Sequence, residues 1–264
     1  MTREKLNYKI LIKKLICLII SQKYIKRIEN LASQLQGKGT GNFSIFQEIN
    51  NCKKLLKNRD IKFILDIGAN KGDYTEELLK HYKDANYYLF EPSILNYQKL
   101  YSKFNNQKNI TIINKALSDE EKDDYLFSDT SGSGLASLNK RKLSHLNINF
   151  NYKEKVNIVR LDNFFEKFNK EVKIDYCKID VEGLELNVLL GFGQFIKKIK
   201  LIQFEFGGSN IDSKIFFRDF WYFFKSFNFE IYRMTFIGPK IINSYSTNDE
   251  FFETTNYIAL NKEL

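Results

Sequence analysis

The sequence predicts an α/β fold built on a mostly parallel, doubly wound sheet, and three observations indicate it. Segments typical of strands alternate with segments typical of helices from residue 61 onward. The stretch 61–74, IKFILDIGANKGDY, joins a short apolar run to a glycine turn and then to a polar helix start. Acidic residues recur where the strands are expected to end, which is the edge where such sheets bind ligands.

The composition fits one α/β domain, or one domain with an appended segment. The 264 residues are 43% hydrophobic and include 24 phenylalanines and 15 tyrosines, enough for a large core. The three cysteines form no CxxC pair, which favours a reducing cytoplasm. Of the net charge of +9, +7 lies in residues 1–27. The remaining chain therefore has no broad cationic face, and we expect no nucleic-acid partner.

Residues 6–28 have the pattern of a basic amphipathic helix. Their longest apolar run, 15–20, is far shorter than the ~20 residues that span a bilayer, so no membrane crossing is expected. Two interpretations stay open. The helix packs on the domain with its lysines in water, or residues 1–28 lie on the anionic inner face of a membrane, which gives peripheral attachment.

The elements follow in order. Residues 36–42, QGKGTGN, indicate a loop, and Ser44 is the expected N-cap of a helix reaching residue 57. The opening strand and its glycine turn come next. Beyond them we expect helices at 73–82, 93–104, 183–196 and 214–227, and strands at 87–90, 110–113, 125–127, 156–161, 174–181, 201–206, 230–235 and 255–260.

Acidic residues close several of these strands. Asp66 ends the first strand and Glu91 the second, Asp180 and Glu182 end the strand at 174–181, and Glu205 ends the next. Any one of them is explained as well by helix capping as by ligand binding. Five on the same edge of one sheet favour a ligand site.

The acidic edge also bears on the cofactor. Glu91 lies 19 residues past Gly72, where a carboxylate takes both hydroxyls of a ribose. The loop contains neither G-x-G-x-x-G nor GK[ST], and several carboxylates would oppose a pyrophosphate. S-adenosylmethionine has no phosphate and carries a sulfonium and an ammonium group. The residues therefore favour it over a nicotinamide dinucleotide.

Four spaced motifs carry a family resemblance: LDIGANKGDYT, FEPS, NKALSD and KIDVEGLELNVLLGF. Through them the chain resembles the FkbM-type methyltransferases over roughly residues 61–206. The resemblance implies a Rossmann-like class I methyltransferase fold with a seven-stranded sheet, occupying 58–264 behind an N-terminal helical extension, 1–57. It implies an S-adenosylmethionine-dependent enzyme that methylates a hydroxyl on a sugar, glycan or related small molecule, as in glycan biosynthesis. Substrate specificity is expected in the polar segment 128–150.

The resemblance also assigns cofactor contacts. The glycine turn would surround the methionine part of the cofactor, Glu91 would hold the ribose, and the end of the third strand would meet the adenine. Asp180 would lie beside the methyl group. The expected cofactor-binding residues are Asp66, Gly68, Asn70, Gly72, Glu91, Ser118 and Asp119.

An alcohol acceptor must lose its proton as the new bond forms, which requires a base within hydrogen-bond reach. We expect Asp180 or Glu182 to be that base, with Glu205 orienting the acceptor. The same three carboxylates suit Mg²⁺, but the spacing does not demand a metal and none is predicted. Two other functions stay open: a nicotinamide-dependent oxidoreductase, and a non-catalytic module recruited to membranes that keeps the fold.

Overall fold

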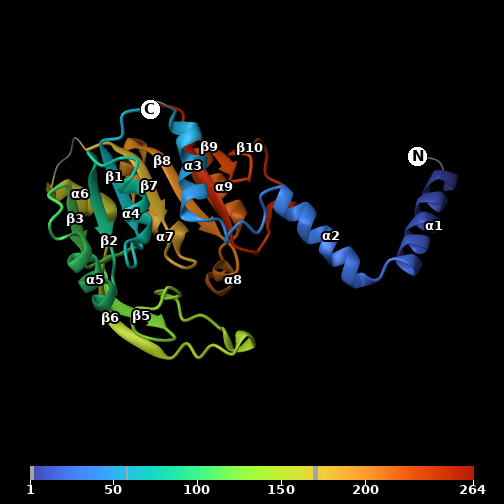
Figure 1. Cartoon of the computed structure of the whole chain (residues 1–264), viewed down its shortest axis with the longest axis horizontal. Helices are drawn as coiled ribbons and strands as arrows, with labels where there is room; N and C mark the ends of the chain where they lie inside the picture. Colours follow the sequence, from blue (N-terminus) through green and yellow to red (C-terminus); the bar gives the residue numbers. More distant parts are fainter. Residues whose placement is uncertain (1–2, 58, 169–171) are drawn as a thin grey trace.

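An eight-stranded mixed sheet forms the centre of the molecule (Figure 1). The computed structural model describes residues 3–57, 59–168 and 172–264, with side chains from residue 8 and none at 167–168. The strand order is β10-β9-β11-β8-β7-β1-β2-β3. The strands are β1 (Phe63–Ile67), β2 (Asn86–Phe90), β3 (Ile110–Ile113), β7 (Ile174–Ile179), β8 (Ile199–Phe206), β9 (Phe229–Arg233), β10 (Lys240–Ile242) and β11 (Thr255–Asn261).

The five strands from β8 to β3 run parallel, and β11 is antiparallel to both β8 and β9. The predicted α/β fold with a mostly parallel sheet is therefore confirmed. One correction concerns the strand count, because the sheet has eight strands where seven are expected. The additional strand is β10, which pairs with β9 over three residues and is too short to show a pattern in the sequence.

A separate three-stranded sheet contains β4 (Ala116–Leu117), β6 (Tyr152–Val159) and β5 (Lys122–Ser128), in that order. The expected strands at 125–127 and 156–161 both belong here, paired antiparallel. Ala116, Leu126, Val156 and Ile158 form a small apolar cluster of their own. In Figure 1, β5 and β6 lie apart from the main sheet, beneath the carboxyl ends of β1 and β2.

Helices cover both faces of the main sheet. They are α3 (Ile45–Leu56), α4 (Asp73–Leu79), α5 (Ile94–Phe104), α6 (Leu161–Phe168), α7 (Glu185–Leu190), α8 (Ser209–Ser213) and α9 (Phe217–Ser226), with 3₁₀ turns η1 (Ser144–Leu146), η2 (Gly193–Lys198) and η3 (Thr247–Asp249). Strand side chains alternate between two cores. One core packs α6, α7 and α9, and the other packs α3, α4 and α5.

Helix α3 begins as predicted. Ser44 and Gln47 form a capping box, in which Ser44 Oγ accepts from the Gln47 amide at 3.3 Å and Gln47 Oε1 accepts from the Ser44 amide at 2.9 Å. Ile49 and Cys52 are fully buried against the sheet. Although α3 precedes the expected domain start at residue 58, it packs as part of the α/β body.

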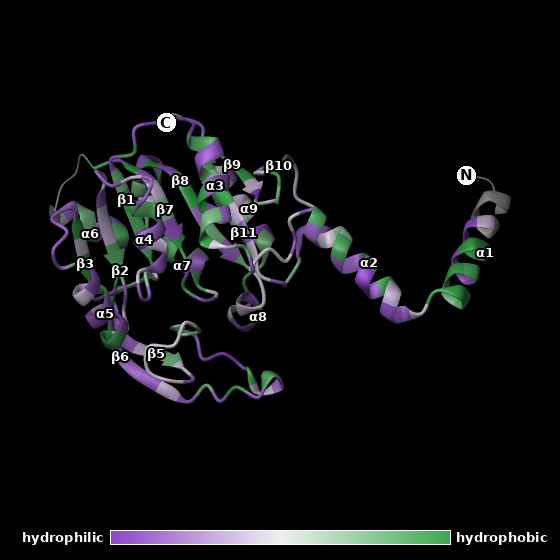
Figure 2. Ribbon diagram, viewed as in Figure 1, coloured by the Kyte–Doolittle hydropathy of each residue, from purple (hydrophilic) through white to green (hydrophobic). Residues whose placement is uncertain are grey.

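Helices α1 (Arg3–Ile19) and α2 (Gln22–Leu35) replace the single helix expected at 6–28. They form an arm that projects from the body, and Figure 2 shows hydrophobic and hydrophilic residues mixed along it. No residue of α2 and no described side chain of α1 is buried, so the arm does not pack on the domain. Of the helices in the described part of the chain, none is both long and apolar enough to span a bilayer.

Candidate active site

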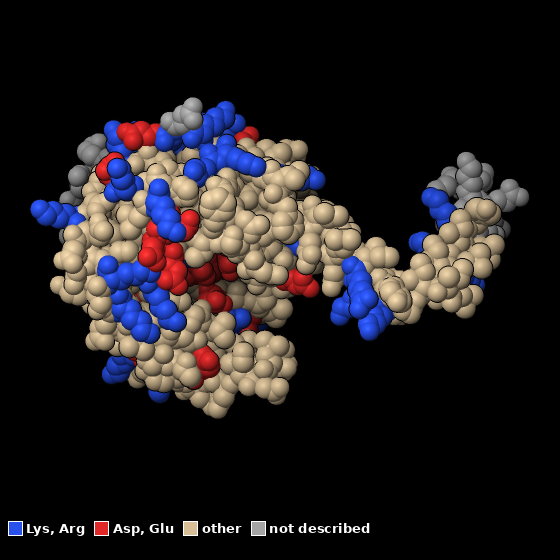
Figure 3. Space-filling model, in the orientation of Figure 1, with Lys and Arg blue, Asp and Glu red and all other residues tan. Residues whose placement is uncertain are grey.

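A cavity of about 280 Å³ opens at the carboxyl ends of β1, β2, β7 and β8. Helix α3, the glycine turn after β1 and the segment 133–138 complete its wall. Figure 3 shows acidic side chains gathered in this hollow of the surface. Six carboxylates line it, namely Glu48, Asp73, Glu91, Asp180, Glu182 and Glu205.

The glycine turn brings backbone close to the cavity. Gly68 has φ +78°, and a Cβ there would lie 1.9 Å from the Asp180 carbonyl oxygen, so no larger residue fits. Asn70 also has a positive φ, 49°, and lines the cavity. Gly72, at φ +79°, does not line it; a Cβ there would lie 2.5 Å from the Phe104 ring. Gly72 therefore makes room for α5.

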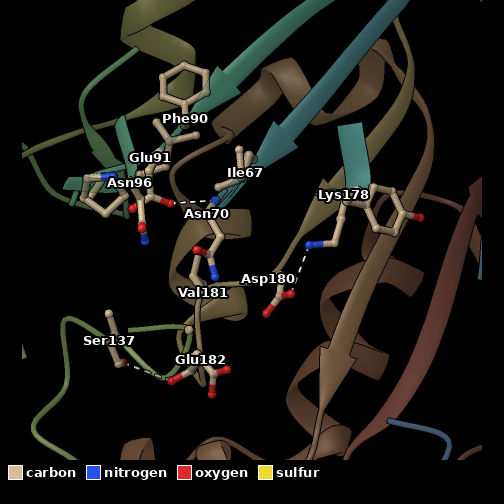
Figure 4. Close-up of a pocket in the computed structure, with 18 of the residues that line it drawn as sticks. Ile67, Asn70, Phe90, Glu91, Asn96, Ser137, Lys178, Asp180, Val181 and Glu182 are labelled. Atoms are coloured by element: carbon tan, nitrogen blue, oxygen red, sulfur yellow. Dashed lines mark hydrogen bonds and ion pairs between the residues drawn. The ribbon is translucent and has the colours of Figure 1, made fainter. Parts of the chain in front are cut away.

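Glu91 is fixed at the end of β2 by two backbone amides. Its Oε2 accepts from Asn70 N at 2.8 Å (Figure 4), and its Oε1 accepts from Ser93 N at 2.9 Å. Burial raises the pKa of Glu91 to about 7, even though both hydrogen bonds oppose the shift. An ionised carboxylate has about four acceptor positions, so each oxygen keeps capacity for a ligand hydroxyl.

Asp66 lies beneath the turn and is fully buried, outside the cavity lining. Its Oδ2 accepts from Thr75 Oγ1 at 2.6 Å, while its Oδ1 has no hydrogen-bond partner in the described structure. Burial raises the pKa of Asp66, and nearby Lys178 opposes that shift. Asp66 thus supports the turn from below.

Ser118 and Asp119 do not line the cavity either. Ser118 Oγ donates to Asp119 Oδ1 at 2.9 Å, and Asn187 Nδ2 donates to the same oxygen at 3.1 Å. These bonds connect the end of β4 to α7. The adenine contact that the resemblance implies for the two residues stays a prediction.

Lys178 and Asp180 form an ion pair on the cavity floor, with Nζ 3.0 Å from Oδ2 (Figure 4). The ammonium group also lies 4.8 Å from the centre of the Tyr74 ring. Burial acts to lower the pKa of Lys178, but Asp180 and Asp66 outweigh it, so the pKa is raised. Lys178 is therefore charged and neutralises Asp180.

Glu182 is held in a strained conformation at the cavity mouth. Its φ is +57°, its carbonyl accepts from Ser137 Oγ at 2.9 Å, and its carboxylate pairs with Arg141 at 2.6 Å. Burial and then Asp180 raise the pKa of Glu182 to about 8. Ser137 and Arg141 both come from the segment 128–150, where specificity is expected.

Glu205, at the end of β8, faces the cavity without a partner: no hydrogen bond or ion pair of its carboxylate is found in the described residues. Burial raises its pKa well above the ordinary value, with Asp180, Glu182 and Glu48 adding to the shift. Three predicted catalytic carboxylates thus meet in one cavity. Within the described ranges, no three Asp, Glu, His or Cys side chains are placed to hold a metal ion.

The sequence reasoning missed Glu48, which reaches the cavity from α3 and is only 8% exposed. It accepts from Gln203 Nε2 at 2.6 Å and from Asn256 Nδ2 at 3.4 Å. The sequence contains a pattern that indicates Glu48, because this glutamate lies on the same face of the helix as Ile45, Ile49 and Cys52. A carboxylate on an apolar stripe has to be satisfied by polar partners or face a site.

One family model matches the chain: the methyltransferase FkbM domain, over residues 66–231. No curated protein matches the sequence. Among solved structures, a precorrin-6y C5,15-methyltransferase from Geobacter metallireducens has TM-score 0.43 and 10% identity, covering 82% of this chain and 87% of that one.

Two further structures contain bound S-adenosylhomocysteine. TrmK from M. capricolum has TM-score 0.42 and 16% identity, covering 83% of this chain and 69% of its own. The plantazolicin methyltransferase BpumL has TM-score 0.44 and 12% identity, covering 92% of both chains. Likeness at this distance supports no conclusion about cofactor or substrate.

Proposed function

The chain belongs to the FkbM methyltransferase family, and from this premise we propose that it transfers a methyl group from S-adenosylmethionine to a hydroxyl of a sugar, glycan or related small molecule. The observation that carries the proposal is that one cavity joins the glycine turn and Glu91 to a cluster of carboxylates at the neighbouring strand ends. The first group suits the cofactor, and the second suits an alcohol acceptor.

The residues present fit this cofactor. Glu91 is held by backbone amides with acceptor capacity to spare for two ribose hydroxyls. At Gly68 the turn borders the cavity with backbone alone. The acidic lining favours a ligand that carries positive charge, and Asn70 and Gly68 would border its methionine part. When bound, S-adenosylmethionine supplies an electrophilic methyl group.

The chain's own contribution is positioning and proton removal. Asp180 lines the cavity in an ion pair with Lys178, and its carboxylate is placed to accept a proton from a hydroxyl. Burial raises the pKa of Glu182 to about 8, so its ionised form is a stronger base than an ordinary carboxylate. We assign the role of base to one of them, and to Glu205 the task of orienting the acceptor. Residues of the segment 133–138 line the same cavity beside these carboxylates.

The arm adds a proposal on location. Its described basic residues (Lys9, Lys13, Lys14, Lys23, Lys26 and Arg27) share two helices with exposed apolar side chains. This combination favours peripheral contact with an anionic membrane on its cytoplasmic side, where a lipid-linked glycan would be presented.

Calorimetric titration with S-adenosylmethionine, S-adenosylhomocysteine and NAD tests the cofactor. We expect the first two to bind the wild type and not Glu91→Ala. Binding of NAD alone would instead indicate an oxidoreductase. For catalysis, alanine is placed in turn at Asp180, Glu182 and Glu205, and methyl transfer to a sugar panel is followed; unchanged turnover in all three variants would reject the assigned roles.

A further inference from the structure

We propose that Glu48 is an acceptor-binding residue which, together with Glu205, makes the enzyme select acceptors whose groups near the reacting hydroxyl carry no negative charge. The inference rests on the proposed function and specifies its substrate class. Neutral sugars and amino sugars belong to this class, whereas uronic acids and phosphosugars do not.

The charge balance of the cavity is the first argument. Asp180 is paired with Lys178, and Glu182 is paired with Arg141. Neither Glu48 nor Glu205 forms an ion pair within the described residues: amides contact Glu48, no described side chain bonds the carboxylate of Glu205, and nearby Lys178 is already paired with Asp180. The α3 and β8 side of the cavity therefore has carboxylates left over once its ion pairs are counted.

The other side of the cavity is different. Lys71 and Lys115 also line it, but they come from the glycine turn and from the segment after β3, the elements that surround Glu91. Lys115 Nζ is hydrogen bonded to Asn157 of the small sheet. The lysines therefore lie with the cofactor-binding elements and do not offset Glu48 and Glu205.

Asn256 relates the positions of Glu48 and Glu205. Asn256 is opposite Glu205 in the register of β11 and β8, and its side-chain amide donates to Glu48 Oε1 at 3.4 Å. Both carboxylates also lie within electrostatic range of one another, as the pKa shift of Glu205 reflects. They form one acidic wall.

Glu48 is also held rigidly. Its partner Gln203 has Nε2 toward Glu48, while its Oε1 accepts from Tyr176 at 2.7 Å and from Tyr74. Because the amide oxygen is occupied by hydroxyl donors, Gln203 cannot turn over without losing them. The carboxylate of Glu48 is thus fixed as an acceptor of hydrogen bonds at the cavity surface.

A wall of this kind discriminates by charge. Hydroxyl and ammonium groups donate hydrogen bonds to carboxylates, whereas a carboxylate or phosphate on the acceptor would be repelled in a partly desolvated site. Glu48 lies outside the matched family region, residues 66–231. The selectivity therefore depends on helix α3 as well as on the family's own motifs.

The test uses three probes of the same shape, methyl β-D-glucopyranoside, the corresponding glucosaminide and the corresponding glucuronide. Saturation-transfer NMR measures their binding to full-length protein saturated with S-adenosylhomocysteine. We compare wild type, Glu48→Gln and Glu205→Gln, in which the size of the side chain is kept, the charge is removed and one oxygen acceptor is replaced by a donor. Glu76→Gln is the matched control, because this exposed glutamate of α4 forms its ion pair with Lys103 at the surface and does not line the cavity.

We expect the neutral and amino sugars to bind the wild type and Glu76→Gln at least tenfold more tightly than the glucuronide, and the difference to shrink at least threefold in Glu48→Gln and in Glu205→Gln. Equal signals from all three probes, whether strong or absent, would overturn the proposal. Undiminished discrimination in Glu48→Gln would also overturn it. Failure of S-adenosylhomocysteine to bind, measured first by calorimetry, would instead reject the proposed function.

Discussion

Glu48 Oε2 accepts a 2.6 Å hydrogen bond from Gln203 Nε2, which ties helix α3 to strand β8 directly beneath the cavity. The bond stabilises a carboxylate that is otherwise costly to bury. Burial raises the pKa of Glu48 to about 7 despite the hydrogen bond and nearby Lys178. The burial that places the Glu48 carboxylate at the cavity therefore also makes its ionised form costly for the stability of the protein.

This coupling predicts that Glu48→Gln stabilises the ligand-free protein at pH 8. A glutamate with a folded pKa above its unfolded value gives stability that is complete below pH 4.5 and lost as the pH rises through about 7. The pKa shift corresponds to a loss of at most about 3 kcal/mol in the free energy of unfolding. Glutamine has no charge to bury, so the Glu48→Gln protein avoids this loss. Urea unfolding at pH 5 and pH 8 measures the difference.

The gain in the free energy of unfolding of Glu48→Gln should appear at pH 8 and nearly vanish at pH 5. Glu76→Gln should change the free energy of unfolding by no more than about 0.5 kcal/mol at either pH. The wild type should itself lose stability over this range, because burial also raises the pKa of Glu91 and Glu185 to about 7. A Glu48→Gln protein that is less stable at pH 8 would contradict the explanation.

A second prediction concerns the turn. Gly68→Ala should destabilise the protein by more than about 3 kcal/mol and abolish S-adenosylhomocysteine binding, because a Cβ at φ +78° would lie 1.9 Å from the Asp180 carbonyl. Gly134→Ala is the matched control, since its Cβ would lie an acceptable 3.4 Å from Asn70 Nδ2. Similar unfolding midpoints for the two variants would show that β1 and β7 can separate at this point.

A third prediction is that S-adenosylhomocysteine affinity depends on pH through Glu91. Only the ionised carboxylate can accept both ribose hydroxyls, and the pKa of Glu91 without ligand is raised to about 7 by burial. Affinity should therefore fall by up to about tenfold per pH unit below pH 7 and level off above it. Calorimetry from pH 5.5 to 8.5 measures this.

Glu91→Gln provides the control for that titration. It should bind about 10- to 100-fold more weakly at pH 8, because one oxygen acceptor is replaced by a donor, and its affinity should change little with pH. If the affinity of Glu91→Gln changed with pH as steeply as that of the wild type, the titrating group would be a residue other than Glu91. Buried Glu185, whose pKa is also raised to about 7, would be the next residue to substitute.

Much of this arrangement was predictable because it depends on local patterns. The run 61–74 predicts a strand, a glycine turn and a helix, and each is present; in the structure Gly68 and Gly72 both have positive φ. Asp180, Glu182 and Glu205 follow apolar strands, so the shared edge of a parallel sheet brings them together.

The rest depends on packing between distant segments, which no local pattern encodes. Arg141 reaches Glu182 across 41 residues, and Glu48 meets Gln203 across 155. Gly72, expected to bind the cofactor, has φ +79°, and the space beside it is filled by the Phe104 ring. The strand end that precedes Ser118 belongs to the small sheet, because 116–117 leave the main sheet to pair with β6.

The last prediction concerns the arm. Its helices expose apolar side chains together with lysines, and Leu18 and Ile19 at the end of α1 are 83% and 80% exposed. Each Lys or Arg near an anionic surface contributes about 1 kcal/mol, and buried apolar area adds to that. Removal of residues 1–35 should therefore abolish sedimentation with phosphatidylglycerol vesicles while leaving S-adenosylhomocysteine affinity within about twofold.

The double variant Leu18→Glu, Ile19→Glu should weaken vesicle binding without a change in the basic residues, which separates apolar insertion from simple charge attraction. Equal partitioning of the full-length and shortened proteins would assign the arm a role other than membrane contact.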